Sequence, residues 1–241
     1  MRTYTSSTRP TAVSITVPTG SIYVEVTERP ADADDPGAAT VSLVPQVACD
    51  TVAEGAIADA TIREELGELT IVVPHRPASS NHGGGVVTNV YTGDGQIFQS
   101  TGGITIINGR IVAGGIAVVT PSGAVDAVLT VPTGAQLRLD GQNTCITVAG
   151  PAGRVTATST NGSITIGAAE HVEATASNGS IHVRRVTGDT TLRTTNGSIC
   201  AATTTTDFQA TTVNGNIEVV ADGVRLPASA VRTVNGRTSI R

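Results

Sequence analysis

The stretch from Ser159 to Val183 reads STNGSITIGAAEHVEATASNGSIHV and contains one short phrase twice. The phrase is an Asn-Gly pair followed by Ser, Ile, a variable residue and Ile or Val. With some variation it recurs at Asn196-Gly197, Asn214-Gly215 and Asn235-Gly236, and Asn143-Thr144 begins an altered sixth copy. Successive asparagines from Asn161 onward are 17, 18, 18 and 21 residues apart. A short, nearly fixed period is typical of a repeat architecture.

Equivalent positions of the repeats keep their chemical type. The positions three and five residues after each asparagine are apolar in almost every copy, and the position between them varies. This period of two is typical of a half-buried strand. Small or apolar residues also lie four residues before each asparagine: Ala157, Ala174, Leu192, Ala210 and Val231. Each repeat is therefore predicted to be a strand, an Asn-Gly corner, a second strand and a looser turn.

The Asn-Gly pairs are predicted to be the structural corners of the fold. Asn and Gly both tolerate positive φ, which explains their use at sharp turns. The corner residues are Asn161, Gly162, Asn178, Gly179, Asn196, Gly197, Asn214, Gly215, Asn235 and Gly236.

Two arrangements fit these repeats. In a single-stranded β-solenoid, equivalent strands of successive coils stack in parallel about 4.8 Å apart. In a meander, each Asn-Gly is a hairpin turn and neighbouring strands are antiparallel. The nearly constant period of about 18 residues favours the solenoid, because stacked coils require each position to keep its chemical type.

The composition fits an all-β protein with a thin core. Aromatic residues make up 2% of the 241 residues, Trp is absent and Gly occurs 27 times, so the core must consist of small and β-branched side chains. The net charge is −5, and neither a basic stripe nor an aromatic platform is evident, so nucleic-acid binding is not expected. Cys49, Cys145 and Cys200 have no paired spacing and do not suggest a disulfide framework.

The chain divides into three segments. Residues 1–75 are predicted to form an irregular β layer, with alternating strands on both sides of Pro18-Thr19-Gly20 and a hairpin turn at Glu65–Glu68. Only residues 59–66 resemble a turn of helix. Residues 76–120 are rich in glycine and are interpreted as a loop with irregular β coils, in which Asn108-Gly109 is a further corner. Residues 121–241 carry the regular repeats. The Val-Pro-Thr-Gly at 131–134 repeats that at 17–20, which suggests two halves that begin alike.

Candidate chemical sites are few. His182 and Cys200 share an outward position one repeat apart, and the best chemistry for such a pair is weak metal binding or a nucleophile with its base. His75 and His82 lie in the Gly-rich loop of residues 74–85 and are also conceivable metal ligands. The Gly-rich runs at 83–85 and 93–95 lack the lysine and the strand–helix context of a phosphate loop. In each case an ordinary structural role is the better interpretation, and no cofactor is predicted.

The acidic residues of the repeats bear on a polysaccharide-cleaving site. Such a site requires clustered carboxylates, but the acids do not share a single column: Glu170, Glu173, Asp189, Asp207, Glu218 and Asp222. Thr147 with Thr165, and Ser159 with Thr194, Thr212 and Thr233, form candidate threonine-rich faces able to order water. Because Ala176, His182 and Cys200 interrupt these rows, a role in β-structure explains them better.

The repeated Ser/Thr-x-Asn-Gly-Ser-Ile phrase, preceded by a Val-Pro-Thr-Gly strand–turn–strand, resembles the bacterial adhesin-like family of β-strand-repeat proteins of unknown function. The resemblance covers residues 125–241 well and 11–75 loosely. It implies a right-handed β-solenoid and carries no established activity.

The sequence predicts a non-catalytic scaffold or interaction protein that binds macromolecules, or copies of itself, through flat faces or open ends. Arg232, Arg237 and Arg241 flank the last strand and would discourage strand addition there. The alternative is a polysaccharide-active enzyme of the β-helix type. Neither a signal peptide nor an apolar span is evident, so a cytoplasmic protein without membrane insertion is expected.

Overall fold

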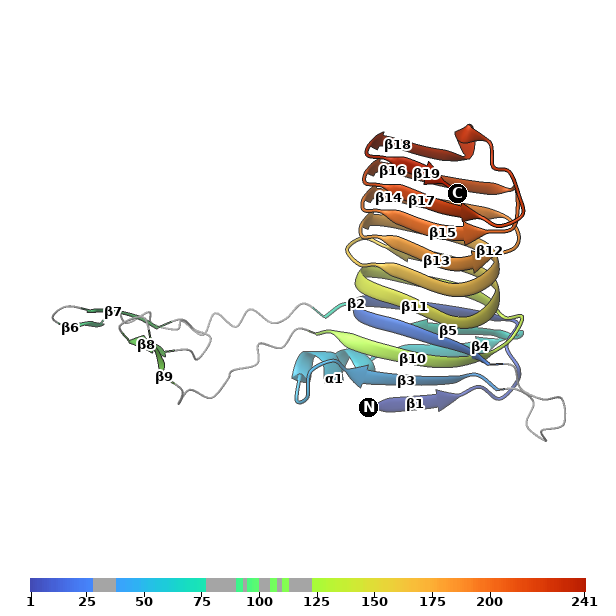
Figure 1. Cartoon of the computed structure of the whole chain (residues 1–241). Helices are drawn as coiled ribbons and strands as arrows, with labels where there is room; N and C mark the ends of the chain where they lie inside the picture. The colour runs from blue at the N-terminus through green and yellow to red at the C-terminus, as the bar shows by residue number, and fades with distance from the viewer. Residues whose placement is uncertain (28–37, 77–89, 93–94, 100–104, 108–109, 113–122) are drawn as a thin grey trace.

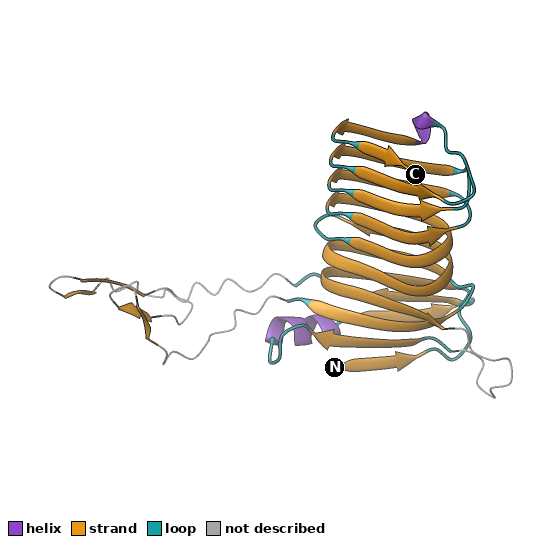
Figure 2. Cartoon of the chain, in the orientation of Figure 1, coloured by secondary structure: helices purple, strands orange, loops and turns teal. Residues whose placement is uncertain are grey.

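The computed structural model describes residues 1–27, 38–76, 90–92, 95–99, 105–107, 110–112 and 123–241. In this part of the chain strands dominate (Figure 2), as the all-β prediction requires. Fifteen strands form one large, mostly parallel sheet that does not close on itself. Figure 1 shows them stacked in layers, with the N-terminal strands at one end and the C-terminal strands at the other.

The strands of the large sheet before the regular repeats are β1 (Arg2–Thr5), β2 (Ala12–Thr27), β3 (Thr40–Pro45), β4 (Thr61–Glu65), β5 (Glu68–Val72) and β10 (Val125–Pro132). Those of the repeats are β11 (Gln136–Ser159), β12 (Ile164–Asn178), β13 (Ile181–Val186), β14 (Thr190–Asn196), β15 (Ile199–Thr203), β16 (Phe208–Asn214), β17 (Ile217–Ala221), β18 (Val231–Asn235) and β19 (Thr238–Ile240).

Equivalent strands of successive repeats pair in parallel and in register. After the asparagines, Ile164 is aligned with Ile181, and Ile181 with Ile199. Before them, Ala174 is aligned with Leu192 and Leu192 with Ala210. The two strands that flank each Asn-Gly therefore do not pair as hairpins, and the meander interpretation is wrong for the repeats.

The inward columns form the core. The isoleucines three residues after each asparagine, from Ile146 to Ile217, are at most 1% exposed. They pack against the small residues of the opposite strands, such as Ala157 and Ala174, which are also buried. Burying apolar surface contributes about 25 cal/mol per Å² to stability, so the buried side chains of each layer stabilise the stack.

The first strands join the same sheet as the repeats. β2 pairs in parallel with β10 on one side and β11 on the other, with Thr19 aligned with Asn143 and Gly20 with Thr144. Thr19-Gly20 therefore occupies the Asn-Gly corner position. Val131, in contrast, is aligned with Val26 at the far end of β2. The two Val-Pro-Thr-Gly stretches lie at different corners, so the idea of two halves that begin alike is wrong.

The N-terminal end contains a helix that the sequence pattern did not reveal. α1 (Thr51–Ala58) begins after Asp50, whose carboxylate accepts hydrogen bonds from the backbone N–H of Val52 and Ala53, both at 3.0 Å. Residues 59–66, the only stretch judged helix-like, instead contain β4. The hairpin turn at Glu65–Glu68 is confirmed, because β4 and β5 are antiparallel and Leu66 and Gly67 have φ of 50° and 82°.

Glu64 on β4 connects β1 and the residues that follow it to the N-terminal end of the stack. Its carboxylate accepts hydrogen bonds from the backbone and hydroxyl groups of Ser7 and Thr8 and from the Tyr4 hydroxyl, at 2.7–3.0 Å. The Ser7 backbone bond, followed by the Thr8 and Tyr4 side chains, lowers the Glu64 pKa to about 2. The same contact raises the pKa of Tyr4.

The middle segment contributes a four-stranded antiparallel sheet of β6 (Val90–Thr92), β7 (Gly95–Gln99), β8 (Thr105–Ile107) and β9 (Arg110–Val112). Its strands are antiparallel neighbours, not the irregular coils expected for this segment. The predicted corner Asn108-Gly109 lies outside the described residues. The division at residues 75 and 120 stays a prediction.

Where the structure describes the chain, no helix combines the length and the apolar character that crossing a lipid bilayer requires.

Candidate functional site

The asparagines of the repeats form a continuous hydrogen-bonded ladder. The Asn161 side-chain amide donates to Asn143 Oδ1, and Asn178, Asn196, Asn214 and Asn235 each donate to the preceding asparagine, all at 2.8 Å. Side chains stacked at strand spacing allow each amide to donate to one neighbour and accept from the next. This ladder had not been predicted, although the column of asparagines was its visible signal.

The glycines of the corners are needed for space rather than for positive φ. Within residues 123–241, which are fully described, no asparagine has positive φ, and Gly215 is the one corner glycine whose φ is positive, at 159°. A Cβ on Gly179 would lie 2.1 Å from the carbonyl oxygen of Gly162, and one on Gly197 would lie 2.1 Å from that of Gly179. The expected left-handed corner is therefore wrong, and the close approach of successive backbones excludes a side chain.

The hydroxyl column two residues before the asparagines faces inward. Ser159, Thr194 and Thr212 are buried. Thr194 and Thr212 donate to the Gly179 and Gly197 carbonyls at 2.9 and 3.0 Å, and Ser159 donates to Thr144 at 2.8 Å. Thr233 does the same toward Gly215 at 3.0 Å. This column is therefore not a water-ordering face, because its hydroxyls satisfy backbone carbonyls at the corners.

His182 and Cys200 are aligned on adjacent strands, as the repeat spacing predicts. Both are exposed, and the next residue in the column, Glu218, lies 3.2 Å from Arg241 in an ion pair. In the described residues no group of three or more His, Cys, Asp or Glu is placed to hold a metal ion. His75 is exposed, whereas His82 and Gly83–Gly85 lie outside the described residues.

A row of hollows crosses the outward face of the strands that precede the corners. The first is lined by Arg138 and Thr156 and has a volume of about 330 Å³. The second, of about 200 Å³, shares Arg154 and Thr156 with the first. The third, of about 390 Å³, shares Asp189 and Thr191 with the second. The fourth, of about 560 Å³, shares Gln209 and Ser229 with the third. We call this row the polar groove.

Two columns of outward side chains line the polar groove. The first column contains Ser14, Arg138, Thr156, Glu173, Thr191 and Gln209. The second contains Gln136, Arg154, His171, Asp189 and Asp207. The sequence analysis considered Glu173, Asp189 and Asp207 only as possible catalytic acids and did not predict the groove that they line.

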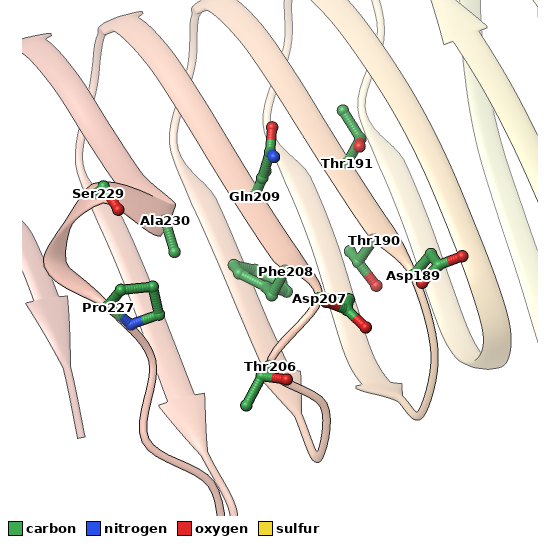
Figure 3. A pocket seen from close by; sticks show the side chains of 10 residues that line it. All are labelled: Asp189, Thr190, Thr191, Thr206, Asp207, Phe208, Gln209, Pro227, Ser229 and Ala230. Carbon is green, nitrogen blue, oxygen red and sulfur yellow. The ribbon is translucent and has the colours of Figure 1, made fainter.

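Asp189 and Asp207 lie side by side, each immediately before a strand, β14 and β16 respectively (Figure 3). Two of the acids thus do share a column. The segment with Pro227, Ser229 and the short helical turn η1 (Ala228–Ala230) borders the same hollow. His171 Nδ1 is 3.7 Å from Asp189 Oδ2 and makes no hydrogen bond within the described structure.

Comparison with known proteins found no matching protein family, no matching curated protein and no matching solved structure.

Proposed function

We propose that this chain is a non-catalytic β-solenoid scaffold, adhesin-like in its repeats and right-handed, which binds an extended macromolecular chain along the polar groove. Support for the solenoid comes from the parallel register, in which equivalent positions of successive repeats are neighbours, and from the buried inward columns. Support for an interaction role comes from the length of the groove, whose hollows follow one another across the strands.

The continuity of the groove is the observation on which the proposal depends. Sites for small molecules are usually single enclosed clefts. Here each hollow shares lining residues with the next, from Ser14 on β2 to Arg232 on β18. The six aligned residues from Ser14 to Gln209 span five strand spacings, or about 24 Å. Such a row suits a ligand that is itself long and thin.

The alternative, a polysaccharide-active enzyme, is favoured by one observation only. Asp189 and Asp207 lie in one column about 4.8 Å apart along the stack, and paired carboxylates perform glycoside hydrolysis. A general acid for that reaction normally lies in a pocket that shields it from water. The Asp189 side chain is 74% exposed, and Asp207 is also exposed, so the pair fits binding better than acid catalysis.

Length dependence tests this proposal. Biolayer interferometry with immobilised protein would measure the affinity of oligosaccharide and peptide series from one to ten units. We expect the affinity to rise with length and to level off once the ligand spans the groove, because each further hollow adds contacts. Equal affinity for a monomer and a decamer would contradict the proposal, and new reducing ends in the oligosaccharide samples would favour the enzyme.

A further inference from the structure

The charges along the polar groove balance. Its hollows are lined by four arginines and four carboxylates: Arg138, Arg154, Arg193, Arg232, Glu68, Glu173, Asp189 and Asp207. A polyanion such as nucleic acid or a polyuronate would meet as many repelling carboxylates as attracting arginines, and a polycation would meet as many repelling arginines as attracting carboxylates. The groove therefore favours a ligand without net charge.

Most of the exposed side chains that line the groove belong to polar residues. Its larger apolar residues, Val13, Leu137, Val172 and Phe208, are each at most 2% exposed and belong to the core. Phe208 is the one aromatic residue that lines the described hollows, and it offers no ring face for stacking. The exposed groups are hydroxyls, amides, carboxylates and guanidinium groups, together with the ring of Pro227. Because the larger apolar side chains are buried, an apolar helix or a lipid chain would meet chiefly Pro227 and the carbon atoms of polar side chains here.

A polypeptide is also a poor ligand for this surface. An extended peptide is usually bound through its backbone at an unpaired strand edge. β12, β14 and β16, which form the floor of the groove, are each hydrogen-bonded to a strand on both sides. A peptide lying across them would lose water from its backbone groups without finding matched backbone partners.

A hydroxyl-rich chain meets all these conditions. Each hydroxyl both donates and accepts, so it can satisfy arginine donors, carboxylate acceptors and threonine hydroxyls. We propose that the polar groove binds a single strand of neutral polysaccharide, with Thr156 and Thr191 as direct contacts. This inference depends on the proposed function, because it names the ligand class for the same groove.

Paired substitutions on two faces test the inference. Isothermal titration calorimetry would measure binding of cellohexaose, xylohexaose and mannohexaose to the wild-type chain and to two double variants. Thr156→Val/Thr191→Val removes two groove hydroxyls while keeping the side-chain shape. Thr147→Val/Thr165→Val makes the same change in the outward column that contains His182, away from the groove. Thermal melting of both variants verifies that they are folded.

We expect at least one hexasaccharide to bind, the groove variant to bind about tenfold or more weakly, and the control variant to bind like wild type. An equal loss in both variants, or none in the groove variant, would overturn the inference. Galacturonic acid hexamer and a nonapeptide of Ser, Gln and Thr serve as comparators. If the nonapeptide binds and no neutral glycan does, this inference fails while the scaffold proposal stands. If nothing binds, both fail.

Discussion

At the scale of single residues, the corner asparagines contribute hydrogen bonds between layers. Asn196 donates to Asn178 and accepts from Asn214, whereas Asn143, at the start of the ladder, accepts from Asn161 alone within the ladder. We expect Asn196→Ala to lower the free energy of unfolding by roughly 1–2 kcal/mol, and Asn143→Ala by about half as much. Urea unfolding followed by circular dichroism measures both. Equal effects would show that the ladder adds nothing beyond local structure.

The corner glycines make a second prediction at this scale. A Cβ on Gly179 would meet the Gly162 carbonyl oxygen at 2.1 Å, and that backbone atom is held by the sheet. A Cβ on Gly153, within β11, would find its nearest neighbour at 3.5 Å. Gly179→Ala should therefore destabilise the fold by roughly 1–3 kcal/mol through overpacking, and Gly153→Ala should be nearly neutral. Similar thermal midpoints for the two variants would refute the close-approach explanation.

These residues show how far the sequence could be interpreted. The repeated Asn-Gly phrase correctly predicted the strands on either side of it, because hydrophobic alternation and repeat spacing are local properties. The role of each glycine was misassigned, because the backbone that excludes a side chain belongs to the neighbouring repeat. The role of Thr194 also depends on the neighbouring repeat, because its hydroxyl donates a hydrogen bond to the Gly179 carbonyl in the layer before it. The polar groove was missed for another reason: stacking predicts that Thr156, Glu173 and Thr191 are neighbours, but the hollows that they line depend on side-chain positions in the folded stack.

At the scale of elements, Glu64 on β4 holds the segment that follows β1. Its pKa is lowered from 4.5 to about 2, chiefly by hydrogen bonds from Ser7 and Thr8 to the charged carboxylate. Because the folded pKa is the lower one, the stabilisation is complete above the unfolded value and is lost as the pH falls from about 4.5 toward about 2.

Thermal melting between pH 7 and pH 2 tests the contribution of the hydrogen bonds to the Glu64 carboxylate. We expect the difference in melting temperature between wild type and Glu64→Gln to be largest near neutral pH and to shrink through that acidic range. Glu65→Gln, one residue along the same strand but exposed, is the matched control and should follow wild type. A constant difference across the range would contradict the role of the charged form.

Helix α1 illustrates the limit of pattern reasoning for elements. Its eight residues are too few for a clear helical period, and its sequence of small residues resembles the surrounding strands. Asp50 gave the available signal as an N-cap. The helix forms because Ala53, Ala56 and Ile57 are buried in the core, and this tertiary contact outweighs weak local preference.

At the scale of the whole molecule, the chain leaves and rejoins the large sheet at one place. A Cβ on Gly123 would lie 3.3 Å from the carbonyl oxygen of Arg76, and the Gly123 N–H donates to Asp50 Oδ2 at 3.0 Å. Arg76 and Gly123, the described residues on either side of residues 77–122, are therefore neighbours. A segment with adjacent ends can be removed without straining the structure that it leaves.

This geometry leads to a prediction about the complete stack. We expect a chain in which residues 77–122 are replaced by a short Gly-Ser linker to fold and to keep the melting temperature of the full chain within a few degrees. The linker must leave Arg76 and Gly123 in place, because Gly123 connects to the cap of α1. All of the described residues that line the polar groove lie outside the segment, so ligand binding should persist. Loss of the β-sheet circular dichroism signal on deletion would show that the stack depends on this segment, and loss of binding by a folded variant would place part of the ligand site within it.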